Sequence, residues 1–196
     1  MRVSGFQVIS WGNVAKALTY YQGLGYKYLE VPWVVSDEAI GVTLPPGGRA
    51  TTTQHGPLVG SAEQSFIQLA LDGKLAPGRY VAATPCFRDE PEDHLHKRSF
   101  FKVELIQLYA EPLLGDTSVE RVRDMVRHAL GFYDTLIKVP SGSLQPTYMQ
   151  PTSEGWDIMC KGVELGSYGY RSYWGFHWVY GTGYADPRFT YVVGGV

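Results

Sequence analysis

Residues 84–90, TPCFRDE, and residues 99–104, SFFKVE, decide the fold, because aromatic and β-branched residues of this kind are typical of strands. We expect the two segments to pair as a β-hairpin. The connecting loop contains four basic or titratable side chains: His94, His96, Lys97 and Arg98. Side chains two positions apart on a strand share a face, so Arg88 and Glu90 point the same way. On the return strand one face presents Phe100, Lys102 and Glu104.

Such a hairpin presents a cation, carboxylates and an aromatic ring on one surface, and this combination suits a nucleoside triphosphate. A guanidinium binds a phosphate, a carboxylate accepts a hydrogen bond from the adenine amino group, and a phenyl ring stacks on the purine. A surface hairpin with paired charges would have a similar sequence. The rest of the chain therefore has to decide between these two interpretations.

Length and composition indicate a globular protein. The 196 residues predict one domain, 1–196, with a substantial core, and 44% of them are hydrophobic. The formal net charge is −2, so no global basic field would draw the protein to nucleic acid or to an anionic membrane.

The cysteines and the N-terminal residues indicate the compartment. Cys86 and Cys160 lie in apolar, strand-like surroundings, and we expect buried thiols rather than a disulfide, which fits a reducing cytosol. The first residues, MRVSGFQVISWGN, lack the apolar region of a signal peptide. No apolar run reaches transmembrane length. We therefore expect a cytoplasmic protein that does not enter the membrane.

Hydrophobic spacing and helix-breaking residues predict three helices. They are expected at residues 14–22, 61–71 and 117–136. Ser61 would be the N-cap of the second helix. Thr117 and Glu120 have the spacing of a capping box at the start of the third.

Strand-like segments account for most of the remaining sequence. One is expected at residues 25–35, with Pro32 at an edge or end, and others in the aromatic, glycine-rich run from 154 to 184. Strands with long connections and few helices predict an α+β fold, in which an antiparallel β-sheet is flanked by helices.

Three separated segments resemble the three signature motifs of class II aminoacyl-tRNA synthetase catalytic domains. Gly25 and Pro32 have the spacing of the first motif, which follows a helix. The arginine-containing hairpin resembles the second. Residues 181–188, GTGYADPR, resemble the third, a glycine-spaced strand that ends in arginine. The three motifs occur in the right order over nearly the whole chain.

Within this class, the seryl-tRNA synthetase group is the most similar. Its TAE loop looks like residues 61–63, SAE, its TPCFRSE like residues 84–90, and its FDKVE like residues 100–104. The segment 164–171, ELGSYGYR, resembles the seryl EISS motif and also the corresponding segment of aspartyl and asparaginyl enzymes. These mixed similarities leave the amino-acid substrate open.

The resemblance implies how ATP would be bound. Arg88 would hold the α-phosphate and the amino-acid carboxylate. Glu90 would accept from the adenine amino group, and Phe100 would stack on the purine. Arg188 would cover the other purine face and bind the γ-phosphate.

The loop between the two strands has two interpretations. We expect it to order over the ATP phosphates, with Arg98 or Lys97 reaching the γ-phosphate. The alternative, a zinc site that uses His94 and His96, has no cysteine or histidine cluster to support it.

The resemblance also implies a metal site and an amino-acid site. Glu164 and Ser167 would bind Mg²⁺. Glu63 and Glu104 would meet the ammonium group of the substrate. Arg171 could pair with a substrate carboxylate or with Glu164.

The sequence departs from the class at its C-terminal end. A helix normally follows the third arginine, yet residues 189–196 are rich in β-branched residues and include a double glycine, which predicts a poor helix. We also see no segment for a tRNA-binding domain.

We therefore expect a stand-alone synthetase-like core that uses ATP and Mg²⁺ to activate an amino acid as an acyl-adenylate. It would be a homodimer through the first-motif helix and strand, as in the class. The acceptor would be a carrier-protein thiol, a small amine or an unusual RNA. The alternatives are a non-catalytic regulatory paralogue that binds an amino acid or nucleotide, and minimal tRNA aminoacylation with a partner subunit.

Overall fold

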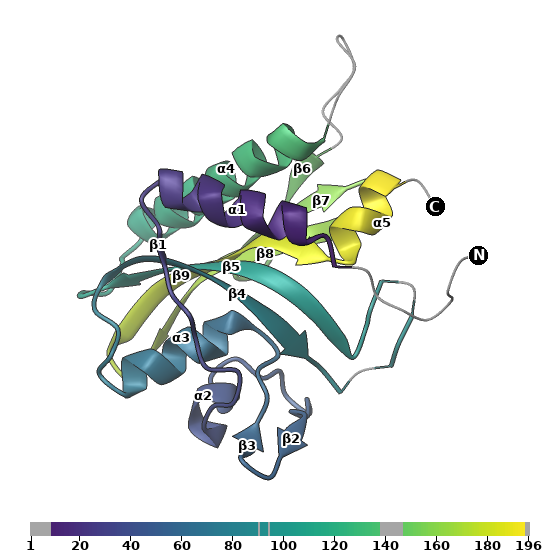
Figure 1. Ribbon diagram of the computed structural model, residues 1–196. Coiled ribbons are helices and arrows are strands. Elements are labelled where there is room, and N and C mark those ends of the chain that lie inside the picture. The colour runs from purple at the N-terminus through teal and green to yellow at the C-terminus, as the bar shows by residue number, and fades with distance from the viewer. Residues whose placement is uncertain (1–8, 90, 94, 138–146, 195–196) are drawn as a thin grey trace.

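The fold is built on one seven-stranded sheet, seen edge-on in Figure 1. The computed structural model describes residues 9–89, 91–93, 95–137 and 147–194. The strand order is β1-β4-β5-β9-β8-β7-β6, and every neighbouring pair is antiparallel except β1 and β4, which are parallel. The strands are β1 (Lys27–Tyr28), β4 (Gly78–Phe87), β5 (Ser99–Tyr109), β6 (Thr147–Pro151), β7 (Gly155–Cys160), β8 (Val163–Tyr173) and β9 (Phe176–Asp186). The α+β prediction is confirmed, with β1 as a parallel addition at the edge.

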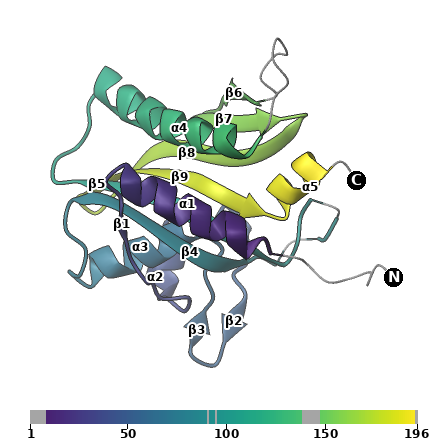
Figure 2. The same ribbon diagram turned by 45° about the horizontal axis from the view of Figure 1, so that its top comes forward.

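Helices cover both faces of this sheet (Figures 1 and 2). One face packs against α1 (Trp11–Gly23), α4 (Asp116–Leu136) and α5 (Arg188–Gly194). The other packs against α3 (Ala62–Leu71), beside which lie α2 (Asp37–Gly41) and the small hairpin of β2 (Thr52–Thr53) and β3 (Gly56–Pro57). None of the helices that the structure describes combines the length and the apolar character needed to cross a bilayer.

The face under α1, α4 and α5 has an aromatic core. Tyr21, Tyr133, Tyr168 and Tyr184 are all buried there, together with Phe132. The hydroxyl groups of the first three donate to backbone carbonyls, and that of Tyr184 donates to the Asp186 carboxylate. Because each buried hydroxyl has an acceptor, these rings add apolar contact area without an unpaired polar group.

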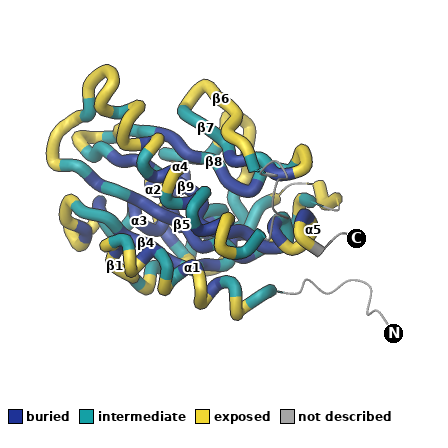
Figure 3. The backbone as a smooth tube through the Cα atoms, turned by 90° about the horizontal axis from the view of Figure 1, so that it is seen from above, coloured by how far each residue is buried: buried dark blue, intermediate teal, exposed yellow. Residues whose placement is uncertain are grey.

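The opposite face has an aliphatic and aromatic core under α3. Phe66, Ile67 and Ala70 of this helix pack on Ile106 of β5 and Trp178 of β9. Buried segments concentrate along the central strands β4, β5 and β9 in Figure 3. The two cysteines are buried free thiols, as predicted.

Two local predictions at helix starts have different outcomes. The Ser61 hydroxyl accepts a hydrogen bond from the Glu63 backbone N–H, so the predicted N-cap is confirmed. The predicted capping box of α4 is wrong. This helix begins at Asp116, and its N-cap is Gly115, which makes no side-chain cap. Gly115 has φ 51°, a conformation that favours glycine, and it is the N-cap two residues before the expected cap, Thr117.

The predicted strand at residues 25–35 is mostly wrong, because only Lys27 and Tyr28 pair with β4. Beyond them the chain leaves the sheet, since the Pro32 carbonyl accepts a hydrogen bond from Ser65 on α3. Val34 forms an isolated bridge with Leu58. Tertiary contacts with α3 and β3 thus take precedence over the strand propensity of this segment.

The prediction of a poor helix after Arg188 is also wrong, because α5 spans Arg188–Gly194. Phe189 and Val192 are buried in the aromatic core, and Thr190 donates to the Asp186 carboxylate. Lys161 donates to the Val192 carbonyl near the helix end. Packing and capping therefore outweigh the poor helix propensity of the β-branched residues.

Candidate functional site

A cavity of about 830 Å³ lies on the α3 face of the sheet. One wall is the loop at residues 43–50. The ends of β4 and β5 with part of their connecting loop form a second wall, and β8, β9 and the start of α5 complete it. The N-terminus of α3 contributes Ser61, Glu63 and Gln64. Segments from the second and third motifs of the sequence thus meet at one cavity, together with residues 61–64 at the start of α3.

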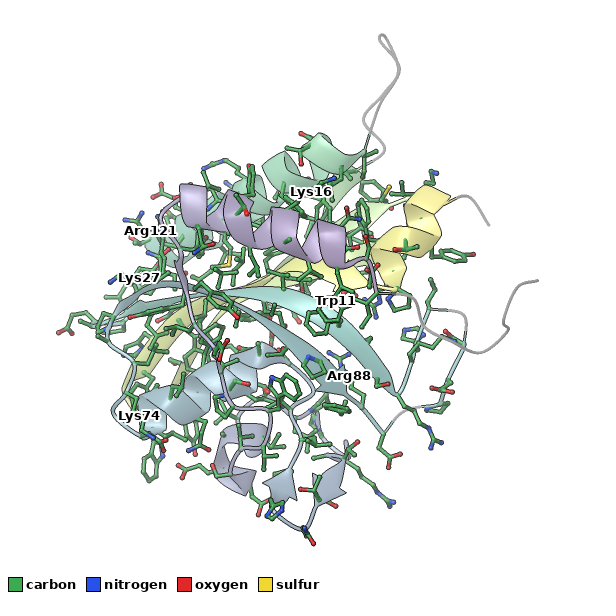
Figure 4. The ribbon with its side chains drawn as sticks, viewed as in Figure 1. Trp11, Lys16, Lys27, Lys74, Arg88 and Arg121 are labelled. Atoms are coloured by element: carbon green, nitrogen blue, oxygen red, sulfur yellow. The ribbon has the colours of Figure 1, made fainter. Side chains whose placement is uncertain are left out.

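Arg88 lies at the end of β4, on the α3 side of the sheet (Figure 4). Its backbone N–H donates to the Arg98 carbonyl, which continues the hairpin by one residue pair. Its Nε donates to the Gly60 carbonyl over 3.3 Å, and its guanidinium lies 5.1 Å from the centre of the Phe100 ring. Among the described residues, no carboxylate lies within 4 Å of this guanidinium. Its terminal nitrogens are therefore available for an anionic ligand.

The predicted face of β5 is confirmed, since Phe100, Lys102 and Glu104 all line the cavity. Glu104 is buried and accepts from Lys102 over 2.8 Å. It also accepts from the Ser61 hydroxyl and the Ala62 backbone N–H. Glu104 thereby fixes the N-terminus of α3 at the cavity wall.

These contacts set the ionisation of Glu104. Burial favours the neutral acid, but the Lys102 ammonium and the donors on α3 outweigh burial. Together they hold the pKa of Glu104 below its usual value. Glu104 is therefore a carboxylate whose oxygens already have partners.

Glu63 and Arg171 form an ion pair of 2.8 Å between α3 and β8. Glu63 also accepts from the Trp178 ring nitrogen over 2.7 Å. Burial raises the pKa of Glu63, although Arg171 and Trp178 oppose this effect. Arg171 binds Glu154 as well, over 2.6 Å, and does not pair with Glu164.

Sequence reasoning missed Glu154 and Tyr180. The Arg171 guanidinium lies 4.2 Å from the centre of the Tyr180 ring, and the Tyr180 hydroxyl donates to Glu154. Gly169 makes this stacking possible, because a Cβ at this position would lie 2.6 Å from the Tyr180 hydroxyl. Glycine at this position of the ELGSYGYR segment was the available signal.

Glu164 and Ser167 both line the cavity, although they are three positions apart on β8 and strict alternation would place them on opposite faces. The register with β7 shifts there, since Met159 pairs with Glu164 and Ile158 with Gly166. Leu165 is therefore an extra residue that changes the alternation, and Glu164 does not share a face with the buried Tyr168. In this arrangement Glu164 binds Arg188 over 2.8 Å.

The oxygen donors near Glu164 fit a hard cation such as Mg²⁺, which is bound by one or two carboxylates plus substrate phosphates. Asp157 is the cross-strand partner of Ser167, and its buried Oδ1 has no hydrogen-bond partner among the residues that the structure describes. Burial raises the pKa of Asp157, and the nearby Glu164 adds to this effect. This pairing of an orphaned oxygen with a second carboxylate has the chemistry of a cation site.

The remaining predicted residues belong to the hairpin loop. Lys97 lines the cavity, whereas Arg98 is not part of its lining, and a phosphate contact by either side chain stays a prediction. Glu90 and His94 lie outside the described residues. His96 pairs with Asp93, and the described part of the chain contains no group of three potential metal ligands among histidine, cysteine, aspartate and glutamate. Arg49, another lining residue, had no sequence signal beyond its place after a Pro-Pro-Gly-Gly turn.

No protein-family model matches the sequence. A serine–tRNA ligase of Hyphomonas neptunium is 32% identical over 122 residues, which are 54% of this chain and 28% of that relative. The chain therefore corresponds to about a quarter of the length of this curated relative.

Solved structures are similar over nearly the whole chain. A pyrrolysyl-tRNA synthetase of Desulfitobacterium hafniense has a TM-score of 0.71 at 15% identity, with 100% of this chain and 72% of that one covered. The chain has the catalytic fold of class II aminoacyl-tRNA synthetases. A seryl-tRNA synthetase of Pyrococcus horikoshii complexed with ATP has a TM-score of 0.71 at 18% identity, over 91% of this chain and 48% of that one. A cytoplasmic serine–tRNA ligase of Naegleria fowleri in complex with AMP has a TM-score of 0.67 at 18% identity, over 92% of this chain and 47% of that one.

The synthetase fold explains the order of the three motifs in space. The first surrounds β1, the second is the β4–β5 hairpin, and the third is β9 with the start of α5. In the third motif Gly183 is an extra residue opposite Val103 and Glu104 of β5. A Cβ at Gly183 would lie 2.6 Å from the Tyr21 ring, so glycine lets the first-motif helix α1 pack directly on β9.

Proposed function

We propose that this synthetase-like core binds ATP and activates an amino acid as an acyl-adenylate. The observation that supports this most is Arg88. Its guanidinium has no carboxylate partner among the described residues and lies beside the Phe100 ring in a cavity of about 830 Å³. A free cation next to an accessible aromatic ring is suited to a nucleotide, because it offers a phosphate partner and a stacking surface together.

ATP would lie between two guanidiniums on separate motifs. Arg88 would bind the α-phosphate and the incoming carboxylate, while Phe100 would stack on the adenine. Arg188 now binds Glu164, and its side chain is only partly buried, so it can turn to the γ-phosphate. Lys97 in the hairpin loop would add a further cation near the phosphates.

The chemistry needs no general base. An amino-acid carboxylate is already ionised at neutral pH. Its oxygen attacks the α-phosphorus, the bond to the bridging oxygen breaks, and pyrophosphate leaves with that electron pair. Glu164 and Ser167, with Asp157 nearby, would hold Mg²⁺, which supplies charge neutralisation to the phosphates. The contribution of the protein is to position two anions and to stabilise the charge of the transition state.

The acceptor of the acyl group is proposed to be a carrier-protein thiol, a small amine or an unusual RNA rather than a whole tRNA. The formal net charge of −2 supports this. On α4, Arg121 and Arg127 share the carboxylate of Asp124 and form no continuous basic stripe.

A homodimer through α1 and β1 is proposed as well. Each element has a large, solvent-exposed aromatic ring, since Trp11 is 59% exposed and Tyr28 is 41% exposed. Exposed aromatic side chains are enriched at protein–protein interfaces.

A regulatory module that binds an amino acid or a nucleotide without catalysis is the second candidate. It is favoured by one observation, the ion pair between Arg188 and Glu164. This ion pair must break before Arg188 can bind the γ-phosphate while Arg88 binds the α-phosphate. Minimal aminoacylation of tRNA with a partner subunit is a third possibility that the same experiment addresses.

The test is ATP–pyrophosphate exchange with each of the twenty amino acids. We expect exchange with one or a few of them, and a loss of about 10²–10³-fold in Arg88→Ala. Arg121→Ala on the opposite face of the sheet is the matched control and should keep wild-type exchange, because Arg121 is exposed on α4. Silence with all twenty would favour the regulatory module, and full exchange by Arg88→Ala would refute the assignment. Adding tRNA, carrier protein or a small amine to an active mixture would then separate the acceptors.

A further inference from the structure

Five charged side chains gather where α3 meets β5 and β8, at one end of the cavity that we call the substrate end. They are Glu63, Lys102, Glu104, Glu154 and Arg171. The ion pairs Lys102–Glu104 and Arg171–Glu63 both lie at the start of α3, where Glu104 binds Ser61 and Ala62. The negative charge of Glu104 raises the pKa of Glu63. Three carboxylates against two cations leave one net negative charge in this cluster.

The guanidinium of Arg171 contacts two carboxylates and one aromatic ring. One terminal nitrogen binds Glu63 over 2.8 Å, and the other binds Glu154 over 2.6 Å. One face of the group lies over the Tyr180 ring. Arg171 is therefore neutralised before any substrate enters, because both of its terminal nitrogens already bind carboxylates.

The two carboxylates that neutralise Arg171 are themselves fixed in place. Glu63 is held at its other oxygen by the Trp178 ring nitrogen. Glu154 accepts from Tyr180 with the same oxygen that binds Arg171. Trp178 and Tyr180 are neighbours on the same face of β9, so one strand positions both acids.

We infer that the substrate end admits an amino acid whose side chain has no negative charge, and that Glu154 and Glu63 exclude acidic side chains by neutralising Arg171. This rests on the proposed function, in which the cavity binds an amino acid. The single α-ammonium group of the substrate offsets the one net negative charge of the cluster, and the α-carboxylate lies toward Arg88. A second carboxylate would remain uncompensated near three others.

The sequence alone leaves the amino-acid substrate open and gives Arg171 two alternative partners, a substrate carboxylate or Glu164. Arg171 ends a segment that resembles aspartyl and asparaginyl enzymes, and a lone arginine in a pocket would suit an acidic substrate. In the structure Arg171 instead pairs with Glu63, 108 residues away, and with Glu154.

The test compares two acidic amino acids with their amides and with two small uncharged amino acids. Calorimetric titration with asparagine and aspartate, glutamine and glutamate, alanine and serine should show that each acid binds about 100-fold more weakly than its amide. Glu154→Gln keeps the shape and an acceptor for Tyr180 but removes one charge. Because the Glu154 side chain is 49% exposed and therefore screened, we expect this variant to narrow the preference by about 10-fold. Glu120→Gln, at an exposed site on α4, should leave the preference unchanged.

The outcomes separate this inference from the proposed function. Aspartate binding as tightly as asparagine, or an unchanged preference in a folded Glu154→Gln, would overturn the charge filter. Binding of none of the six amino acids would overturn the filter, and together with silent pyrophosphate exchange for all twenty it would overturn the amino-acid site as well. Selective binding without pyrophosphate exchange would leave the filter standing and refute only the activation reaction.

Discussion

The two faces of the sheet use tyrosine side chains for different purposes, one to fill a core and the other to support a cavity. Under α1 and α4, the tyrosine hydroxyls are directed at backbone and carboxylate acceptors, and the rings fill a closed core. On the α3 face, Tyr180 supports an arginine, and the polar groups surround a cavity. The same strand, β9, supplies Tyr184 to the core and Tyr180 to the cavity. Stability and ligand binding are therefore assigned to opposite sides of one sheet.

The largest expected effect is on the core face. Phe132 is 1% exposed and contacts the rings of Tyr20, Tyr21, Tyr133 and Tyr184. Phe132→Ala should lower the free energy of unfolding by about 3–5 kcal/mol, because it removes transfer energy and leaves a void. Urea denaturation measures this loss. A change below about 1 kcal/mol would contradict the assignment of this face as the main source of stability.

The matching change on the cavity face is Arg188→Ala. Since its ion pair with Glu164 is partly exposed, we expect a loss of unfolding free energy of at most about 1 kcal/mol. Pyrophosphate exchange should fall by about 10²–10³-fold, because one charge-stabilising donor is removed. If Arg188→Ala kept its exchange activity, or if it unfolded, the result would contradict the assignment of ligand binding to one face and stability to the other.

A smaller effect is expected at the contact between α1 and β9. The Tyr21 hydroxyl donates to the Gly183 carbonyl over 2.9 Å. Tyr21→Phe keeps the ring and leaves this acceptor without its donor, so the unfolding free energy should fall by about 1 kcal/mol. Thermal unfolding at fixed pH measures the change. Unaltered stability would mean that this hydrogen bond contributes nothing to holding the first-motif helix.

The most gradual effect is the pH dependence due to Glu104. Its folded pKa is below its unfolded value, so its stabilising contribution is complete above about pH 4.3 and is lost as the pH falls through the folded pKa. The difference in unfolding free energy between wild type and Glu104→Gln should therefore be largest near neutral pH and should shrink in acid. Denaturation at several pH values tests this. A difference that stays constant or grows in acid would show that Lys102 and the α3 donors do not outweigh burial.

The sequence predicted the parts of the fold that depend on local pattern. The hairpin of β4 and β5, the Ser61 cap and the shared face of Phe100, Lys102 and Glu104 all follow from alternation and capping chemistry. The three motif spacings placed Arg88 and Arg188 at one site. The hairpin, the cap and the shared face require only neighbours along the chain or across one hairpin, whereas the common site of Arg88 and Arg188 came from the resemblance to class II synthetases.

The missed features depend on register and on distant partners. Leu165 and Gly183 each insert an extra residue into the sheet, and simple alternation therefore assigns their neighbours to the wrong face. The pairing of Arg171 with Glu63 joins α3 to β8, and no local spacing encodes it. The helix after Arg188 forms because Phe189 and Val192 find places in a core that the rest of the chain builds.

The most direct test is a crystal structure with a non-hydrolysable ATP analogue and Mg²⁺. The account predicts adenine stacked on Phe100, the α-phosphate on Arg88, and Arg188 turned from Glu164 to the γ-phosphate, with the core face unchanged. A nucleotide bound outside this cavity, or one in the cavity with Arg188 still paired to Glu164 and Arg88 empty, would contradict it.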